Sequence, residues 1–162
     1  MGLFQSVRGS ASKACWDVVL AKVSITDLEL SGKRVLVRVD FNVPLEHGNI
    51  VDDTRIRASL PTIRHILQEG ALPVLMSHLG RPKGMPDAKF KLDPAAKRLE
   101  ELIGKKIKKF DETFSLEIKD YIEKEMKNGD IILLENLRFN PGEKVNDEDF
   151  SRALSSLADI YV

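Results

Sequence analysis

Short apolar runs alternate with segments of helical periodicity along most of this chain. Runs over residues 35–39, 72–76 and 130–134 are bounded by turn-forming residues, which is typical of strands buried on both faces. A fourth run begins at Ile160. Because helical patterns separate these runs, we predict an α/β fold, with a doubly wound, mostly parallel sheet and helices on both faces in an α/β/α arrangement.

The helical segments carry their own boundary signals. The first is expected to begin at Asp53, but Pro61 lies inside it, so this helix should be kinked or should consist of two pieces that meet near Ser59. Asn146 is expected to cap the last helix. Lysines gather at residues 105–109, just after another helix, and we expect them to form a solvated end that suits the helix dipole.

Composition disfavours several classes of protein. With 25 basic and 25 acidic residues, the chain lacks the positive charge of a general nucleic-acid binder. No apolar run approaches the length of a membrane span. Cys15 is the only cysteine, so no disulfide can form within the chain, and we expect a reducing, cytoplasmic compartment.

Residues 1–21 differ from the rest and are expected to form an N-terminal extension. Their basic, Ser-containing and acid-poor composition suits a transit peptide, which would target the protein to an organelle. Met1, Gly2 and Ser6 also match the N-myristoylation pattern, in which Gly2 would carry the lipid and Cys15 could take a second acyl chain. The third interpretation is an extension without a role.

Residues 22–162 are expected to form one domain, because this length suffices to bury a core. The sequence ends inside the apolar run that begins at Ile160. Natural domains seldom end inside a buried strand, so we expect these residues to be an incomplete domain of a larger protein.

The first strand contains an unexpected charge. Side chains alternate along a strand, so Arg38 and Asp40 should share one face near its carboxyl end. A buried arginine needs a partner, and Asp40 is the nearest candidate. The two residues could form a structural ion pair, or they could belong to a ligand site at the carboxyl end of a parallel strand.

Polar residues follow three consecutive strands at the same end. The clusters are Arg38, Asp40 and Asn42; Ser77, His78 and Arg81; and Glu135, Asn136 and Arg138. Because the carboxyl ends of parallel strands lie along one edge of a sheet, these clusters should converge, and Arg55 from the first helix can join them. Arginine forks match carboxylate and phosphate oxygens, so the expected ligand is a small, multiply anionic molecule.

The loop after the second strand should hold the guanidinium group of Arg81 in a fixed position. Gly80 allows a tight turn, and Arg81 precedes Pro82, which holds the backbone of Arg81 extended. His78 alone would more often be a structural histidine. Its position two residues past a strand and near Arg81 favours a role in the site instead.

Several motifs of catalysis do not occur in the sequence. It has no P-loop, no G-x-G-x-x-G, no pair of His or Cys residues at metal-ligand spacing and no nucleophile elbow. We therefore expect no metal ligands in this chain. A positively charged anion site without a visible chemical catalyst suits phosphoryl transfer, in which positioning and charge stabilisation dominate.

Three segments, RVDFNVP, SHLGRP and LLENLRFNPGE, resemble the N-terminal, phosphoglycerate-binding domain of the phosphoglycerate kinase family in order and spacing. The resemblance covers residues 23–162. It implies reversible phosphoryl transfer between 1,3-bisphosphoglycerate and ADP, which gives 3-phosphoglycerate and ATP. It also implies a monomer with small-molecule substrates and without nucleic-acid partners.

The resemblance further implies roles for individual residues. Asp40 and Asn42 would contact the glycerate part of the substrate. His78, Arg81 and Arg138 would bind the phosphate that is not transferred. Arg55 would be catalytic, by stabilising the transferring group, and Arg38 would support the site. The remaining residues of the site would be Val39, Phe41, Ser77, Gly80 and Leu137.

Two parts of the family pattern do not occur in this sequence. They are a further basic motif after the strand that begins at Ile160 and the C-terminal nucleotide-binding domain. Mg²⁺ with ATP or ADP is therefore expected to bind in the full-length protein and not to this chain alone, which we expect to be inactive by itself. The alternative is a non-catalytic, truncated anion-binding module of the same fold.

Overall fold

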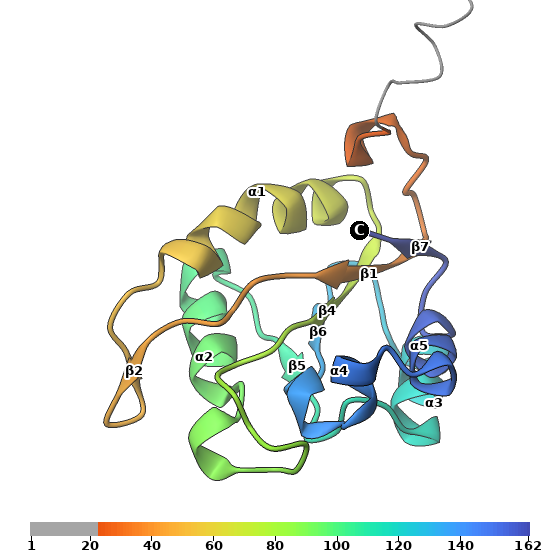
Figure 1. Cartoon of the computed structure of the whole chain (residues 1–162). Coiled ribbons are helices and arrows are strands. Elements are labelled where there is room, and N and C mark those ends of the chain that lie inside the picture. Colours follow the sequence, from red (N-terminus) through yellow and green to blue (C-terminus); the bar gives the residue numbers. More distant parts are fainter. Residues whose placement is uncertain (1–22) are drawn as a thin grey trace, which may run out of the picture.

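The computed structural model describes residues 23–162, and a five-stranded parallel sheet forms its centre (Figure 1). The strands are β1 (Arg34–Arg38), β4 (Leu72–Met76), β5 (Lys108–Lys109), β6 (Ile132–Leu133) and β7 (Ile160–Tyr161). Their order across the sheet is β5-β6-β4-β1-β7, and every neighbouring pair is parallel. This sheet confirms the predicted α/β fold class.

Helices cover both faces of the sheet and complete three layers (Figure 1). The helices on one face are α1 (Thr54–Gln68) and α2 (Asp93–Ile103), and those on the other are α3 (Leu116–Lys124) and α5 (Glu148–Ser155). Successive strand side chains enter opposite cores: Val35 and Val37 pack on the α1–α2 side, while Leu36 packs on the α3–α5 side. Burial on both faces explains why β4 and β6 and the interior of β1 are apolar.

The sheet register brings the strand ends level with one another. Arg38 lies opposite Met76 where β1 pairs with β4, and Leu75 lies opposite Leu133 where β4 pairs with β6. The chain therefore leaves all three strands along one edge. The polar clusters predicted from the sequence follow at that edge.

Shorter elements connect the main ones. They are the 3₁₀ helices η3 (Ile25–Asp27), η4 (Ala88–Phe90) and η5 (Leu137–Phe139), the short helix α4 (Gly142–Val145), and the hairpin of β2 (Leu45–Glu46) and β3 (Asn49–Ile50). The turn depends on His47 and Gly48, which both have positive φ angles, of 49° and 79°.

Two helix boundaries differ from alternatives that the sequence suggested. Of the two forms predicted for the first helix, kinked or divided near Ser59, the division does not occur, because α1 runs through Pro61 as one helix. Pro61 is exposed, and a continuous buried stripe from Ile56 to Ile66 holds both halves against the same sheet. Asn146 does not cap the last helix: it ends α4 in a left-handed conformation, and the Asp147 side chain caps α5.

Within residues 23–162, no helix combines the length and apolarity needed to cross a membrane. The predicted transit peptide and the acylation candidates Gly2 and Cys15 lie outside the described residues.

Candidate functional site

The end of β1 is not organised as predicted. Arg38 is exposed rather than buried, with 43% of its side chain accessible, and it pairs with Glu143 of α4 at 2.7 Å instead of with Asp40. Asp40 accepts hydrogen bonds from Arg55 Nη1 at 2.8 Å and from the Asn42 backbone N–H at 3.0 Å. Because the strand ends at Arg38, side-chain alternation no longer relates the two residues.

Ser77 and Asn42 tie the exit of β1 to the exit of β4. The buried Ser77 hydroxyl donates to the Val39 carbonyl at 2.8 Å and accepts from the Phe41 N–H at 2.9 Å. The Asn42 side chain accepts from the Gly80 N–H at 2.8 Å. Each of these bonds satisfies a backbone N–H or carbonyl group that lies beyond the paired part of its strand. Together they fix the position of the loop after β1 relative to the loop after β4.

Asn136 ties the third loop to the second. Its side-chain oxygen accepts from the N–H groups of Leu79 and Arg138, at 3.2 and 3.1 Å, and its amide donates to the carbonyls of Leu79 and Phe90, at 2.8 Å each. Asn136 and Glu135 belong to the third polar cluster predicted for this edge. Both are fully buried and bind main-chain groups inside the domain, so their side chains are not accessible to a ligand.

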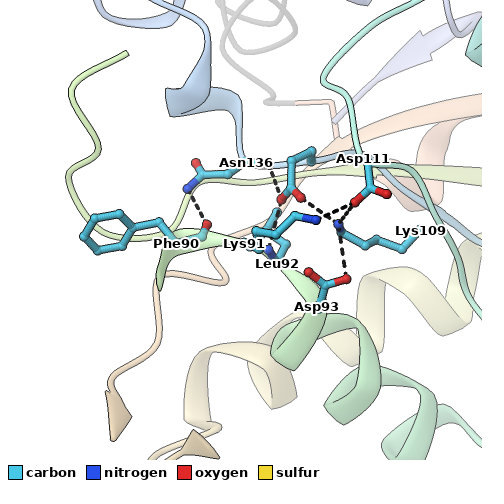
Figure 2. Close-up of polar contacts among 8 residues, drawn as sticks. Phe90, Lys91, Leu92, Asp93, Lys109, Asp111 and Asn136 are labelled. Carbon is cyan, nitrogen blue, oxygen red and sulfur yellow. Dashed lines mark hydrogen bonds and ion pairs between the residues drawn. The ribbon is translucent and has the colours of Figure 1, made fainter. Parts of the chain in front are cut away.

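A buried ion pair lies beneath these loops (Figure 2). Lys109 Nζ lies 2.6 Å from Glu135, whose other oxygen accepts from the N–H groups of Leu92 and Asn136. Lys109 also binds Asp111, at 2.9 Å, and Asp93, at 3.3 Å. The pair therefore connects β5, the start of α2 and the loop that carries Arg138.

Lys109 was predicted to belong to a solvated helix end, and this is wrong. It lies on β5 with only 10% of its side chain exposed, and Glu135 is 1% exposed. Burial opposes the charge of Lys109, but hydrogen bonds to Glu135 and Asp111 outweigh it and raise the pKa of the lysine. Lys91 and Lys109 together lower the pKa of Asp111 to about 2.

Arg138, His78 and Glu143 meet at the edge of the sheet. Arg138 donates through Nη1 to the Gly80 carbonyl at 2.9 Å, while its Nε lies 3.6 Å from Glu143 and has no hydrogen-bond partner although it is buried. Burial and the neighbouring Arg138 guanidinium lower the pKa of His78, while Asp40 and Glu143 oppose the shift. The neutral imidazole is thus favoured beside these charges.

Arg55 and Arg81 complete the charged edge. Arg55 stands in the first turn of α1 and makes an ion pair with Asp40 in which both side chains are about half exposed. Arg81 is exposed and makes no ion pair or side-chain hydrogen bond with any other residue of the range 23–162. Two cations at the edge are therefore accessible to a ligand.

Gly80 cannot be replaced without rebuilding the loop before Arg81. Its φ angle is +62°, and an added Cβ atom would lie 2.3 Å from the ring of Phe90. The other lining residues predicted from the resemblance, Val39, Phe41 and Leu137, bury their side chains in the cores. Any contact they make with a ligand would come from main-chain atoms.

Glu143 is the site residue that the sequence interpretation missed. Its carboxylate is only 9% exposed and faces both Arg38 and Arg138. An acid that follows an Asn-Pro-Gly turn gives no local signal of this role, because the contact to Arg38 spans 105 residues.

The side chains gathered at this edge carry more positive than negative charge. Of its four arginines, Arg55 pairs with Asp40, Arg38 and Arg138 pair with Glu143, and Arg81 makes no ion pair within residues 23–162. In the described part of the chain, no group of three or more His, Cys, Asp or Glu side chains could hold a metal ion. The geometry therefore suits binding of a small, multiply charged anion.

Comparison with known proteins finds similar proteins in one family. A family model described as phosphoglycerate kinase matches residues 25–162. The chain is 53% identical over 143 residues to the phosphoglycerate kinase of Moorella thermoacetica, and 55% identical over 146 residues to that of Dictyoglomus turgidum. Each alignment covers 88% of this chain and 36% of the relative, so the chain spans about a third of the length of these relatives.

Solved structures give the same result. The phosphoglycerate kinase of Coxiella burnetii matches with a TM-score of 0.74 at 34% identity, over 86% of this chain and 34% of that one. The enzyme of Pyrococcus horikoshii matches with a TM-score of 0.73 at 31% identity, over 85% of this chain and 35% of that one.

Proposed function

The chain belongs to the phosphoglycerate kinase family, and from this we propose that residues 23–162 are the phosphoglycerate-binding part of such a kinase. The reaction would be reversible phosphoryl transfer between 1,3-bisphosphoglycerate and ADP, giving 3-phosphoglycerate and ATP. The observation that carries the proposal is the gathering of Arg38, His78 and Arg138 at one sheet edge, next to the Arg55–Asp40 pair.

The proposed roles are those that the resemblance to the family implies, and the position and exposure of the residues are compatible with them. The phosphate that stays on the substrate would be bound by Arg138, His78 and the accessible Arg81. The charge of this phosphate does not change during the reaction, so it needs only to be paired in the bound substrate. Asp40 and Asn42 would bind the glycerate part. Arg55 makes a half-exposed ion pair with Asp40. Replacing that ion pair by a contact with the ligand costs little free energy. Arg55 is therefore free to contact the phosphoryl group while it is transferred.

Nucleotide and Mg²⁺ would act through the rest of a full-length kinase. Family membership implies that such proteins use both. In the full-length protein the metal would supply charge neutralisation on the nucleotide. We assign no Mg²⁺ ligands to residues 23–162, where the positive charge comes from arginine side chains.

The second candidate is a non-catalytic anion-binding module of the same fold, which needs only the arginine-rich edge described above. The two candidates differ in nucleotide binding. Titration of the protein isolated from its own cells with Mg-ATP separates them, because a module should bind 3-phosphoglycerate without binding Mg-ATP, whereas a full-length kinase should bind both.

Calorimetric titration of this chain with 3-phosphoglycerate tests the proposal. We expect saturable binding, and we expect Arg138→Ala to weaken it by about 10- to 100-fold, since one charge-assisted hydrogen bond contributes about 1.5–3 kcal/mol. Arg152→Ala is the matched control, because Arg152 is exposed on α5 and pairs only with Glu148. Absence of binding by the unaltered chain, or equal binding by both variants, would contradict the proposal.

Binding of sulfate should strengthen as the pH falls from about 8 to about 6. The pKa of His78 is lowered in the empty site, and a bound anion would favour the imidazolium, so binding should take up a proton. We expect about a fivefold gain in affinity, which corresponds to about 1 kcal/mol of charge interaction. Sulfate does not titrate in this range, and carboxyl groups generally titrate near pH 4. In His78→Gln the affinity for sulfate should be independent of pH. If this variant still bound sulfate more tightly at pH 6 than at pH 8, as the unaltered chain should, the assignment to His78 would be refuted.

A further inference from the structure

Glu143 is an acid built into a site that otherwise gathers cations. Its carboxylate lies 2.7 Å from Arg38 Nη2 and 3.6 Å from Arg138 Nε, and 9% of its side chain is exposed. A carboxylate buried to this degree requires paired charge. Arg38 and Arg138 supply that charge from two different elements, the end of β1 and η5.

The local backbone holds Glu143 in this position. It stands in the first turn of α4, where the Asn140 side chain accepts from the Gly142 N–H at 2.8 Å and the Asp147 N–H donates to the Gly142 carbonyl at 2.9 Å. A Cβ atom on Gly142 would lie 2.9 Å from Asp147 Cβ. The turn therefore depends on glycine, and it directs the next residue toward the arginines.

The contacts leave the arginines only partly satisfied. Arg138 Nε is buried without a hydrogen-bond partner, because its distance to Glu143 is too long for a hydrogen bond. Arg38 keeps 43% of its side chain exposed beside Glu143. Both guanidinium groups thus retain donors for an external anion while sharing one internal negative charge.

We propose that Glu143 is an internal counter-ion of the anion site, which positions Arg38 and Arg138 and lowers the affinity of the site for simple anions. A ligand must then make further contacts along the edge, with residues such as Asn42 or Arg81, to bind tightly. The inference rests on the proposed function only for the location of the site. It adds a residue that sets selectivity for a larger, multiply charged substrate over a simple inorganic anion.

Titration of this chain with sulfate at low ionic strength tests the proposal. Removing the carboxylate in Glu143→Gln keeps the shape of the side chain, and we expect sulfate affinity to rise about fivefold because one nearby negative charge is lost. Glu148→Gln is the matched control: it removes the same charge from α5, where Glu148 pairs only with Arg152, and should leave sulfate affinity unchanged. Unchanged or weaker sulfate binding in Glu143→Gln would overturn the proposal.

A second pair of variants guards against a folding defect. Arg38→Met should weaken sulfate binding at least tenfold, since Glu143 then opposes the charge of Arg138 alone. Adding Glu143→Gln to Arg38→Met should restore most of the lost affinity, a rescue that a misfolded protein could not show. Absence of rescue in a folded double variant would also overturn the proposal. Binding of 3-phosphoglycerate is measured separately, so its failure would reject the proposed function without deciding the role of Glu143.

Discussion

Lys109→Met is expected to lower the free energy of unfolding by about 3–5 kcal/mol, as removal of one member of a buried ion pair generally does. The substitution leaves Glu135, which is 1% exposed, without its closest positive partner. Glu135 also accepts hydrogen bonds from the N–H groups of Leu92 and Asn136, so its carboxylate cannot move to solvent without breaking these bonds. Urea denaturation followed by circular dichroism measures the loss.

Lys106→Met is the matched control for this prediction. Lys106 lies three residues away, is 95% exposed and is 3.5 Å from Glu100, so its loss should change the free energy of unfolding by less than about 1 kcal/mol. Equal effects of the two substitutions would show that the buried pair does not support the fold. Because Asn136 connects this pair to Arg138, we also expect Lys109→Met to weaken binding of 3-phosphoglycerate.

Arg55→Ala is expected to lower kcat by about 100-fold or more in a full-length phosphoglycerate kinase that carries this segment. The proposed reason is that Arg55 meets charge that develops only as the phosphoryl group moves. Arg81 and Arg138 should instead hold a phosphate whose charge is constant, so Arg81→Ala and Arg138→Ala should mainly raise KM. Arg55→Lys should restore activity only in part, because an ammonium group lacks the planar fork.

Steady-state kinetics of these variants, measured side by side, provides the check. Arg57→Ala is a suitable control, since Arg57 lies two residues further along α1 and pairs with Asp53 away from the site. It should leave kcat unchanged. Equal losses of kcat in Arg55→Ala and Arg138→Ala, or no loss in Arg55→Ala, would refute the separation of roles.

Local pattern was sufficient for much of the fold. The apolar residues of β1 and β4, and those of the buried stripe on α1, recur at the spacing of a strand or a helix. This spacing can be recognised within a few residues of sequence. The gathering of Arg38, His78 and Arg138 was also predictable, because parallel strands must end at one edge. Each of these features depends on short-range geometry or on a general rule of sheet topology.

Sequence reasoning failed for charged residues whose ion-pair partners are distant in the sequence. It assigned Asp40 to Arg38, whereas the partner is Glu143, 105 residues away. It assigned Lys109 to solvent, whereas Lys109 joins the edge of the sheet and pairs with Glu135, 26 residues away. A two-residue strand such as β5 carries too little pattern to be recognised by itself.

The sequence by itself therefore determined the α/β class, the strand and helix faces and the edge at which the polar loop residues gather. Only the tertiary structure decided which charges are buried, which are paired and which remain accessible to a ligand. The physical reason is that burial of apolar surface follows local periodicity. The pairing of charges depends instead on distances between whole elements, which are set only when those elements pack.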